Sequence, residues 1–299
     1  MKKRLTITLL LWMTVFSGTV CAQATLLISE LLYQPLSGEA EYVELYNDSN
    51  QDIELADYHI VRWVGDSLGK HYPLPQHTVA THSYVVLTKD AASVMANYTV
   101  KHLNRLIECS LPTYPNNGGS VVLSTADSII IDRFDYLPSM HSRLLRDKAG
   151  VALERRSFVR PTNEAGNWFS ASSTSGYGTP GYANSQSTEY LATEASFEFS
   201  STLLSPDGDG YQDVLEINYR LEDNDLSARI DIYDGHGTLV KRLVNSGLLG
   251  THGTLEWDGR NDNGQTLPQG QYIVQISLYN LHGERQTFRR TVGLITPSH

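Results

Sequence analysis

The chain has 299 residues, of which 40% are hydrophobic and 19% are charged, with 23 basic and 33 acidic side chains. The net charge of −10 argues against a nucleic-acid-binding protein, because affinity for nucleic acids comes largely from Lys and Arg on phosphates. An acidic surface is compatible with binding of divalent cations, and the length suits two domains.

The N-terminus predicts a secretory signal peptide over residues 1–24. Residues 2–4 are basic, residues 5–20 are mostly apolar, and small residues follow in Cys21-Ala22-Gln23-Ala24. These are the three parts of a secretory signal, and the apolar run is shorter than the ~20 residues that a membrane span needs. We therefore expect cleavage after Ala22 or Ala24, no transmembrane span in the mature chain, and a protein that is secreted or held at the outer surface.

Cleavage changes the charge and the cysteine content. Residues 1–22 hold three basic and no acidic groups, so the mature chain has 20 basic and 33 acidic residues and a net charge of 20 − 33 = −13. Cys21 leaves a lipoprotein as an alternative, although Val20 fits poorly before a lipidated cysteine. Otherwise only Cys109 remains, so no intramolecular disulfide is expected, and Cys109 is predicted to be a small buried residue rather than a reactive thiol.

Short apolar runs separated by Gly, Pro, Asn, Asp and Ser predict an all-β protein built as β-sandwiches. The predicted strands of the N-terminal part are Thr25–Glu30, Tyr42–Tyr46, Tyr58–Trp63, Tyr84–Thr88, Ser120–Ser124 and Ile129–Phe134. Those of the C-terminal part are Val214–Tyr219, Ala228–Tyr233, Thr254–Trp257, Tyr272–Tyr279 and Gln286–Val292.

A change in composition near residue 190 predicts the domain boundary. Residues 170–194 are rich in Ser, Thr, Gly, Asn and Ala, which predicts a linker or a loosely packed edge. Apolar alternation resumes at Phe197. We therefore predict a first domain over residues 25–184, a linker over 185–194 and a second domain over 195–299.

In the first domain, Glu30 and Glu44 are candidates for a carboxylate pair, and paired carboxylates can perform acid–base chemistry. The interpretation we favour is structural: glutamates near strand ends commonly accept bonds from backbone N–H groups or face water. His71, His77 and His82 lie in a proline-broken stretch without the spacing of known zinc sites, so we do not expect zinc there.

An ordered set of segments in residues 25–184 resembles the lamin-tail domain family found in exported bacterial proteins. The resemblance implies an immunoglobulin-like β-sandwich and no catalytic activity. The segments are Leu27–Glu30, Glu41–Asn47, Ile53–Tyr58, Tyr84–Leu87, Asn117–Leu123, Ile131–Tyr136 and Gly178–Asn184.

The second domain contains the strongest candidate for a ligand site, the segment Ser205–Asp213. Asp207, Asp209 and Asp213 fall within seven positions around two glycines, and glycine allows the tight turns that gather oxygen atoms. Clustered carboxylates are what Ca²⁺ requires, so we predict a calcium site at these three residues. The terminal glutamate of an EF-hand loop is missing, so Glu216 or a distant residue would complete the shell. An acidic turn without metal is the alternative.

A further cluster, Trp257–Gly264, contains Asn263-Gly264, which is typical of a turn. We interpret it as a hairpin with Trp257 as a core residue rather than as a second cation site.

Residues 205–292 resemble the immunoglobulin-like domain related to the flagellar hook-capping protein. They are also similar to the C-terminal domains of gliding-motility and type IX-secreted proteins of Bacteroidetes, which implies a role in sorting or surface attachment. The segments that carry this resemblance are Ser205–Asp213, Ile232–Asp234 with Gly237, Val240-Lys241, Trp257–Gly259 and Gly264–Tyr272.

Together these observations predict a non-enzymatic, exported interaction or scaffold protein. Its partner would be a protein or a glycan at the cell surface, and its C-terminal domain would serve secretion or anchoring. We find no Gly-x-Ser-x-Gly, His-Glu-x-x-His or P-loop motif, so no catalytic residues are assigned. The alternatives are a secreted hydrolase accessory protein and a carbohydrate-binding protein, in which Trp63, Trp168 or Trp257 would stack on sugars.

Overall fold

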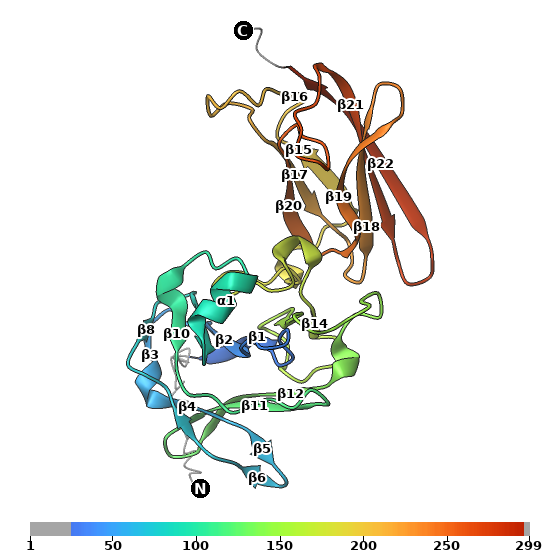
Figure 1. Ribbon diagram of the computed structural model, residues 1–299. Coiled ribbons are helices and arrows are strands. Elements are labelled where there is room, and N and C mark those ends of the chain that lie inside the picture. The colour runs from blue at the N-terminus through green and yellow to red at the C-terminus, as the bar shows by residue number, and fades with distance from the viewer. Residues whose placement is uncertain (1–24, 296–299) are drawn as a thin grey trace, which may run out of the picture.

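The computed structural model describes residues 25–295, which form two β domains arranged end to end (Figure 1). The signal peptide predicted for residues 1–24 and Cys21 lie outside these residues. The prediction of an all-β chain in two β domains is confirmed, with one short α-helix, α1, at Ala91–Asn97.

The first domain consists of two main sheets that enclose one core. The six-stranded sheet has the order β10-β9-β2-β1-β13-β14, and the four-stranded sheet has the order β12-β11-β4-β7. Two small ribbons, β3-β8 and β5-β6, flank them. The strands are β1 (Leu26–Leu32), β2 (Tyr42–Asn47), β3 (Ile53–Glu54), β4 (Tyr58–Val61), β5 (Trp63–Val64), β6 (Ser67–Leu68), β7 (Tyr72–Pro73), β8 (Thr78–Val79), β9 (Tyr84–Thr88), β10 (Leu106–Glu108), β11 (Gly119–Thr125), β12 (Ile130–Tyr136), β13 (Leu153–Arg155) and β14 (Trp168–Ser170).

The six-stranded sheet is buried on both faces. Val43 and Leu45 of β2 point into the core between the sheets, whereas Tyr42 belongs to a second cluster that includes Val94 of α1. Alternation of side chains along the strand therefore places Glu44 beneath a covering layer instead of in water.

The second domain is also a sandwich, with the three-stranded sheet β15-β17-β20 facing the five-stranded sheet β16-β22-β21-β18-β19. Trp257 is 1% exposed in its core, which confirms its interpretation as a core residue. The strands are β15 (Ser196–Phe199), β16 (Leu203–Leu204), β17 (Leu215–Arg220), β18 (Ser227–Asp234), β19 (Leu239–Leu248), β20 (His252–Trp257), β21 (Gly270–Tyr279) and β22 (Arg285–Leu294).

Short 3-10 helices occupy several connections. They are η1 (Leu55–Asp57), η2 (Leu103–Arg105), η3 (Pro138–Met140), η4 (Ser173–Ser175) and η5 (Thr188–Tyr190). Of these, η4 contacts β19 and β20 of the second domain, and the ring of Tyr190 in η5 lies 4.0 Å from that of His252 in β20.

The expectation that residues 170–194 form a linker or a loosely packed edge is wrong for residues 170–172, 178–181 and 184–186, which are buried. Ser170, Ala171, Ser172 and Gln186 are fully buried, although the segment contains few large apolar side chains. Hydrogen bonds take the place of apolar contacts. The Ser185 carbonyl accepts a bond from the Thr251 backbone N–H at 2.8 Å, which ties this segment to the second domain.

The tryptophans considered as sugar-stacking residues in the carbohydrate-binding alternative do not present free rings. Trp168 is 4% exposed and stacks on Phe134 with ring centroids 3.6 Å apart, so its ring is not available to a sugar. The ring of Trp63 is covered by the guanidinium group of Arg133 at 4.3 Å.

Candidate functional site

The loop between β16 and β17 brings together the three aspartates predicted to bind calcium. One carboxylate oxygen from each of Asp207, Asp209 and Asp213 lies within 4.8 Å of the others. Within residues 25–295 this is the only group of three or more His, Cys, Asp or Glu side chains close enough to share a metal ion. Glu216, which the sequence suggested as a further ligand, is not part of it.

Backbone hydrogen bonds shape this loop. The Asp207 carboxylate accepts a bond from the N–H of Asp209 at 3.1 Å, and Asp209 accepts one from Tyr211 at 2.7 Å. These two-residue spacings are Asx turns, the local structure that Asp side chains favour. Asp213 closes the loop by accepting bonds from the N–H groups of Gly208 and Gly210, both of which have positive φ angles.

The loop keeps its charge and retains free acceptor capacity. The bonds from Gly208 and Gly210 lower the pKa of the partly exposed Asp213 carboxyl below its usual value. No Lys or Arg among the described residues forms an ion pair with these aspartates. Each carboxylate oxygen can accept two bonds, and Oδ2 of Asp209 accepts none within the described part of the chain. The arrangement therefore offers oxygen ligands with uncompensated negative charge, as a divalent cation requires.

The first domain contains a second carboxylate triad, formed by Glu30 of β1, Glu44 of β2 and Glu154 of β13. The strands place Glu30 opposite both other residues, and all three side chains are fully buried. The sequence predicted the Glu30–Glu44 pair and its structural role but missed Glu154. A strand as short as β13, with one apolar residue, carries little signal of its own.

Donors from one segment, residues 179–186, satisfy most oxygen atoms of this triad. Glu30 accepts bonds from the backbone N–H and the hydroxyl of Thr179 at 3.0 Å. Glu44 accepts the N–H of Gly181 at 2.6 Å, and Glu154 accepts the N–H of Gln186 at 2.9 Å. The other oxygen of Glu44, Oε1, is buried without a partner among the described residues.

Burial decides the ionisation of the glutamates. Desolvation, followed by the charge of Glu154, raises the pKa of Glu30 to about 8. Desolvation likewise raises the pKa of Glu154 to about 7 and that of Glu44 well above its usual value. A proton on Glu44 Oε1 would remove a charge from the interior without breaking any hydrogen bond, because that oxygen accepts none from residues 25–295.

The segment held by the glutamates also docks the second domain. The side-chain amide of Gln186 donates to the Leu249 carbonyl at 3.2 Å, and the Ser185 carbonyl accepts a bond from the Thr251 hydroxyl at 3.2 Å. Ser173, which precedes this segment, donates to the Leu248 carbonyl at 2.7 Å. A Cβ atom at Gly250 would overlap with the carbonyl oxygen of Ser185. The glutamates therefore act as a clamp on residues 179–186, and through them on the domain junction.

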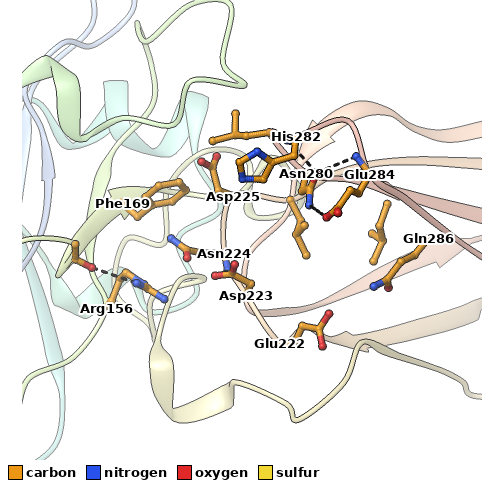
Figure 2. A pocket seen from close by; sticks show the side chains of 14 residues that line it. Arg156, Phe169, Glu222, Asp223, Asn224, Asp225, Asn280, His282, Glu284 and Gln286 are labelled. Atoms are coloured by element: carbon orange, nitrogen blue, oxygen red, sulfur yellow. Dashed lines mark hydrogen bonds between the residues drawn. The ribbon is translucent and has the colours of Figure 1, made fainter.

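A cleft of about 520 Å³ opens beside this junction (Figure 2). Arg156 and Phe169 line it from the first domain; the loop before β18 and the hairpin between β21 and β22 line it from the second. The hydroxyl of Ser142 donates a hydrogen bond to Asp225 across the junction. Figure 2 shows Asp223, Asn224 and His282 around the same space.

Cys109 is half-buried, and burial raises the pKa of its thiol to about 11. It is therefore protonated at neutral pH and a poor nucleophile.

No helix in the described part of the chain is both long and apolar enough to cross a membrane.

Comparison with known proteins identifies two families. Residues 19–138 match the model of the lamin tail domain, and residues 198–294 match that of the CHU_C type IX secretion signal domain. The segment Gly178–Asn184 lies beyond the first match. Among curated proteins, none matches this chain.

Several solved structures are similar to parts of this chain. FlgD from P. aeruginosa has 19% identity and a TM-score of 0.24, over 34% of this chain and 69% of its own. Latent PorU from Porphyromonas gingivalis has 10% identity and a TM-score of 0.28, over 95% of this chain and 21% of its own. PorZ, a surface component of the type IX secretion system of the same organism, has 12% identity and a TM-score of 0.26, over 90% of this chain and 38% of its own.

The chain thus carries a lamin tail domain followed by a C-terminal type IX secretion signal domain, and this signal indicates secretion to the outer surface.

Proposed function

We propose that this protein is a non-enzymatic interaction protein of the outer surface, with two domains held in a fixed arrangement. The observation that carries the proposal is the use made of the buried glutamates. Glu30, Glu44 and Glu154 would be the obvious groups for acid–base chemistry, yet their oxygens accept bonds from the chain's own residues 179–186. Catalysis would need these groups to reach a substrate.

The proposal includes a structural role for calcium. Asp207, Asp209 and Asp213 would hold a Ca²⁺ ion in the loop between β16 and β17. Neutralising three clustered charges would stabilise a loop that begins and ends in the core, at Leu204 and Leu215. Calcium would thereby protect the second domain outside the cell.

The localisation and the absence of catalysis can be tested together. We expect the protein in the outer-surface fraction of intact cells, accessible to an added protease. We expect the purified chain to show no turnover of phosphoesters, glycosides or peptides, with or without Ca²⁺. Turnover that is lost in Asp209→Ala would contradict the proposal, because the aspartate loop would then be a catalytic metal centre.

Carbohydrate binding at the junction cleft is a second candidate function. It is favoured by the cleft itself, which combines the aromatic ring of Phe169 with the amides of Asn224 and Asn280. Sugars bind through stacking on aromatic faces and hydrogen bonds to such groups. Retention on a glycan array that disappears in Phe169→Ala but survives in Trp63→Ala would support it. No retention by any glycan would exclude this candidate.

A further inference from the structure

The strand β22 has one paired edge and one open edge. It pairs with β21 along all ten of its residues, from Arg285 to Leu294, without a register shift. On its other side, β16 pairs with Gly293 and Leu294 alone. Within the described residues, the edge from Arg285 to Thr291 therefore has no strand beside it.

Hydrogen bonds fix which groups this open edge presents. The backbone N–H of Gly293 donates to the Thr202 carbonyl, on the side of β16, at 2.9 Å. Because N–H groups alternate in direction along a regular strand, those of Thr287, Arg289 and Thr291 point the same way. These N–H groups point to the side on which β16 pairs with the end of β22. Thr287, Arg289 and Thr291 are all exposed.

The opposite edge of the same sheet is different. The pairing of β19 with β18 contains three register shifts, and such bulges are a common protection against unwanted strand pairing. Its arginine Arg242 is held by Asp231 at 2.8 Å. The β22 edge is regular, so its backbone N–H and C=O groups remain evenly arranged for pairing with another strand, whereas those of β19 do not.

The side chains of β22 add a positive charge that nothing in the described residues neutralises. Arg285 donates to the Ser277 hydroxyl, and Arg289 donates to Gln275. Within residues 25–295, neither these two arginines nor Arg290 forms an ion pair. This gathering is unusual for the domain, which has eight basic and fourteen acidic residues over 195–295.

We propose that the open edge of β22 binds an extended acidic segment of a partner protein by accepting it as an additional strand. Main-chain bonds to Thr287, Arg289 and Thr291 would supply affinity, and alternate acidic side chains would meet Arg285 and Arg289. A second copy paired through the same edge is disfavoured, because arginines would then face arginines. This proposal goes beyond the function proposed above, since it does not depend on calcium.

The arginines could instead serve only to keep the edge from aggregating, as charges on edge strands often do. The two roles differ in whether the sign of the side-chain charge matters. Glutamates in place of Arg285 and Arg289 would protect the edge equally well but would repel an acidic strand.

The test uses residues 25–299 and a fluorescent peptide in which glutamate alternates with valine. We expect saturable binding by fluorescence anisotropy that weakens as salt is added, and no binding of the same peptide with lysine for glutamate. The double variant Arg285→Glu/Arg289→Glu should bind the acidic peptide about tenfold or more weakly and gain affinity for the lysine peptide. Arg260→Glu, which makes the same charge change outside β22, should behave as the unmodified chain.

The same acidic peptide with methyl groups on its backbone nitrogens keeps its charges but loses its N–H donors. It should bind more weakly than the unmethylated peptide, because a strand needs its own N–H groups for pairing. If the methylated and unmethylated peptides bound equally well, the contact would be electrostatic only, and the proposal that the peptide adds as a strand would be wrong. No binding of the acidic peptide, or self-association of the chain that the double variant abolishes, would overturn the proposed partner. None of these results depends on Ca²⁺, so they are separate from the test of the aspartate loop.

Discussion

Each domain of this protein holds three carboxylates close together, and the two triads have opposite environments. Glu30, Glu44 and Glu154 are fully buried on adjacent strands, and burial raises their pKa values. The aspartates of the β16–β17 loop are largely exposed, and hydrogen bonds lower the pKa of Asp213. Burial favours the neutral form and exposure the charged form. The same functional group therefore serves as a structural clamp in one domain and as a candidate ligand in the other.

The largest effect should come from removing a member of the buried triad. We expect Glu30→Ala to lower the free energy of unfolding by about 3–5 kcal/mol. The substitution leaves a cavity, and the buried donors of Tyr42 and Thr179 lose their hydrogen-bond acceptor. Urea denaturation measures this. Glu216→Ala, at an exposed position of β17, is the control and should change stability by less than about 0.5 kcal/mol. A loss below about 1 kcal/mol in Glu30→Ala would show that the triad is not a clamp.

The next effect tests whether the clamped segment couples the domains. We expect Gly250→Ala to cost about 1–3 kcal/mol, because its methyl group would overlap with the Ser185 carbonyl. Calorimetry should then resolve two transitions in place of a coupled one. Gly235→Ala is the matched control, since its added methyl group meets only ordinary contacts, at 3.8 Å. Identical traces for the two variants would mean that the junction does not depend on this contact.

A smaller effect should appear in the pH dependence of the free energy of unfolding. The folded state holds protons on the glutamates at pH values where the unfolded chain, with pKa values near 4.5, has released them. Stability should therefore fall as the pH rises through the folded pKa values of about 7 and 8. His141 and His252, whose pKa values desolvation lowers to about 4, act in the opposite direction, and their effect levels off about one pH unit above the unfolded value of 6.5.

We expect a loss of about 1–2 kcal/mol between about pH 6.5 and about pH 8, measured by urea denaturation at each pH. Glu44→Gln should have a flatter dependence, since glutamine cannot release a proton. Stability that does not change over this range would mean that the buried glutamates are already ionised in the folded protein, because both states would then bind no protons there.

The smallest effect should come from the exposed triad in the absence of a cation. With chelator present, Asp209→Ala should change stability by less than about 0.5 kcal/mol, because the side chain is exposed and its charge is repelled by its neighbours. Thermal denaturation in chelator measures this, with Asp258→Ala as an exposed control outside the loop. A larger loss would make the loop itself, rather than a bound ion, the stabilising element.

The sequence predicts the exposed triad better than the buried one, for a physical reason. Asp207, Asp209 and Asp213 are close in sequence, and glycines between them force a tight loop, so local pattern is enough. Glu154 joins Glu30 through pairing of strands more than a hundred residues apart, which no local pattern encodes. The strands Tyr84–Thr88 and Ser120–Ser124 were predictable from apolar runs and lie within β9 and β11.

The burial of residues 170–172, 178–181 and 184–186 was not predictable in this way. Their Ser, Thr, Asn and Gly content is typical of exposed loops, but buried hydrogen-bond partners on other strands replace water. The strand β19 was also missed, because its polar residues interrupt the apolar alternation and its register shifts disturb the period.

The most direct test of the contrast between the two triads is a thermal melt of residues 25–299 with Ca²⁺ and with chelator. At a hundredfold excess over Kd, a ligand specific for the folded state adds about 2.7 kcal/mol, which moves the midpoint of a domain of this size by several degrees. We predict that the midpoint of the unfolding transition rises with Ca²⁺ in the unmodified chain and in Glu44→Gln, but not in Asp209→Ala. An unchanged midpoint, or a rise that survives Asp209→Ala, would contradict the assignment of the exposed triad as the cation site.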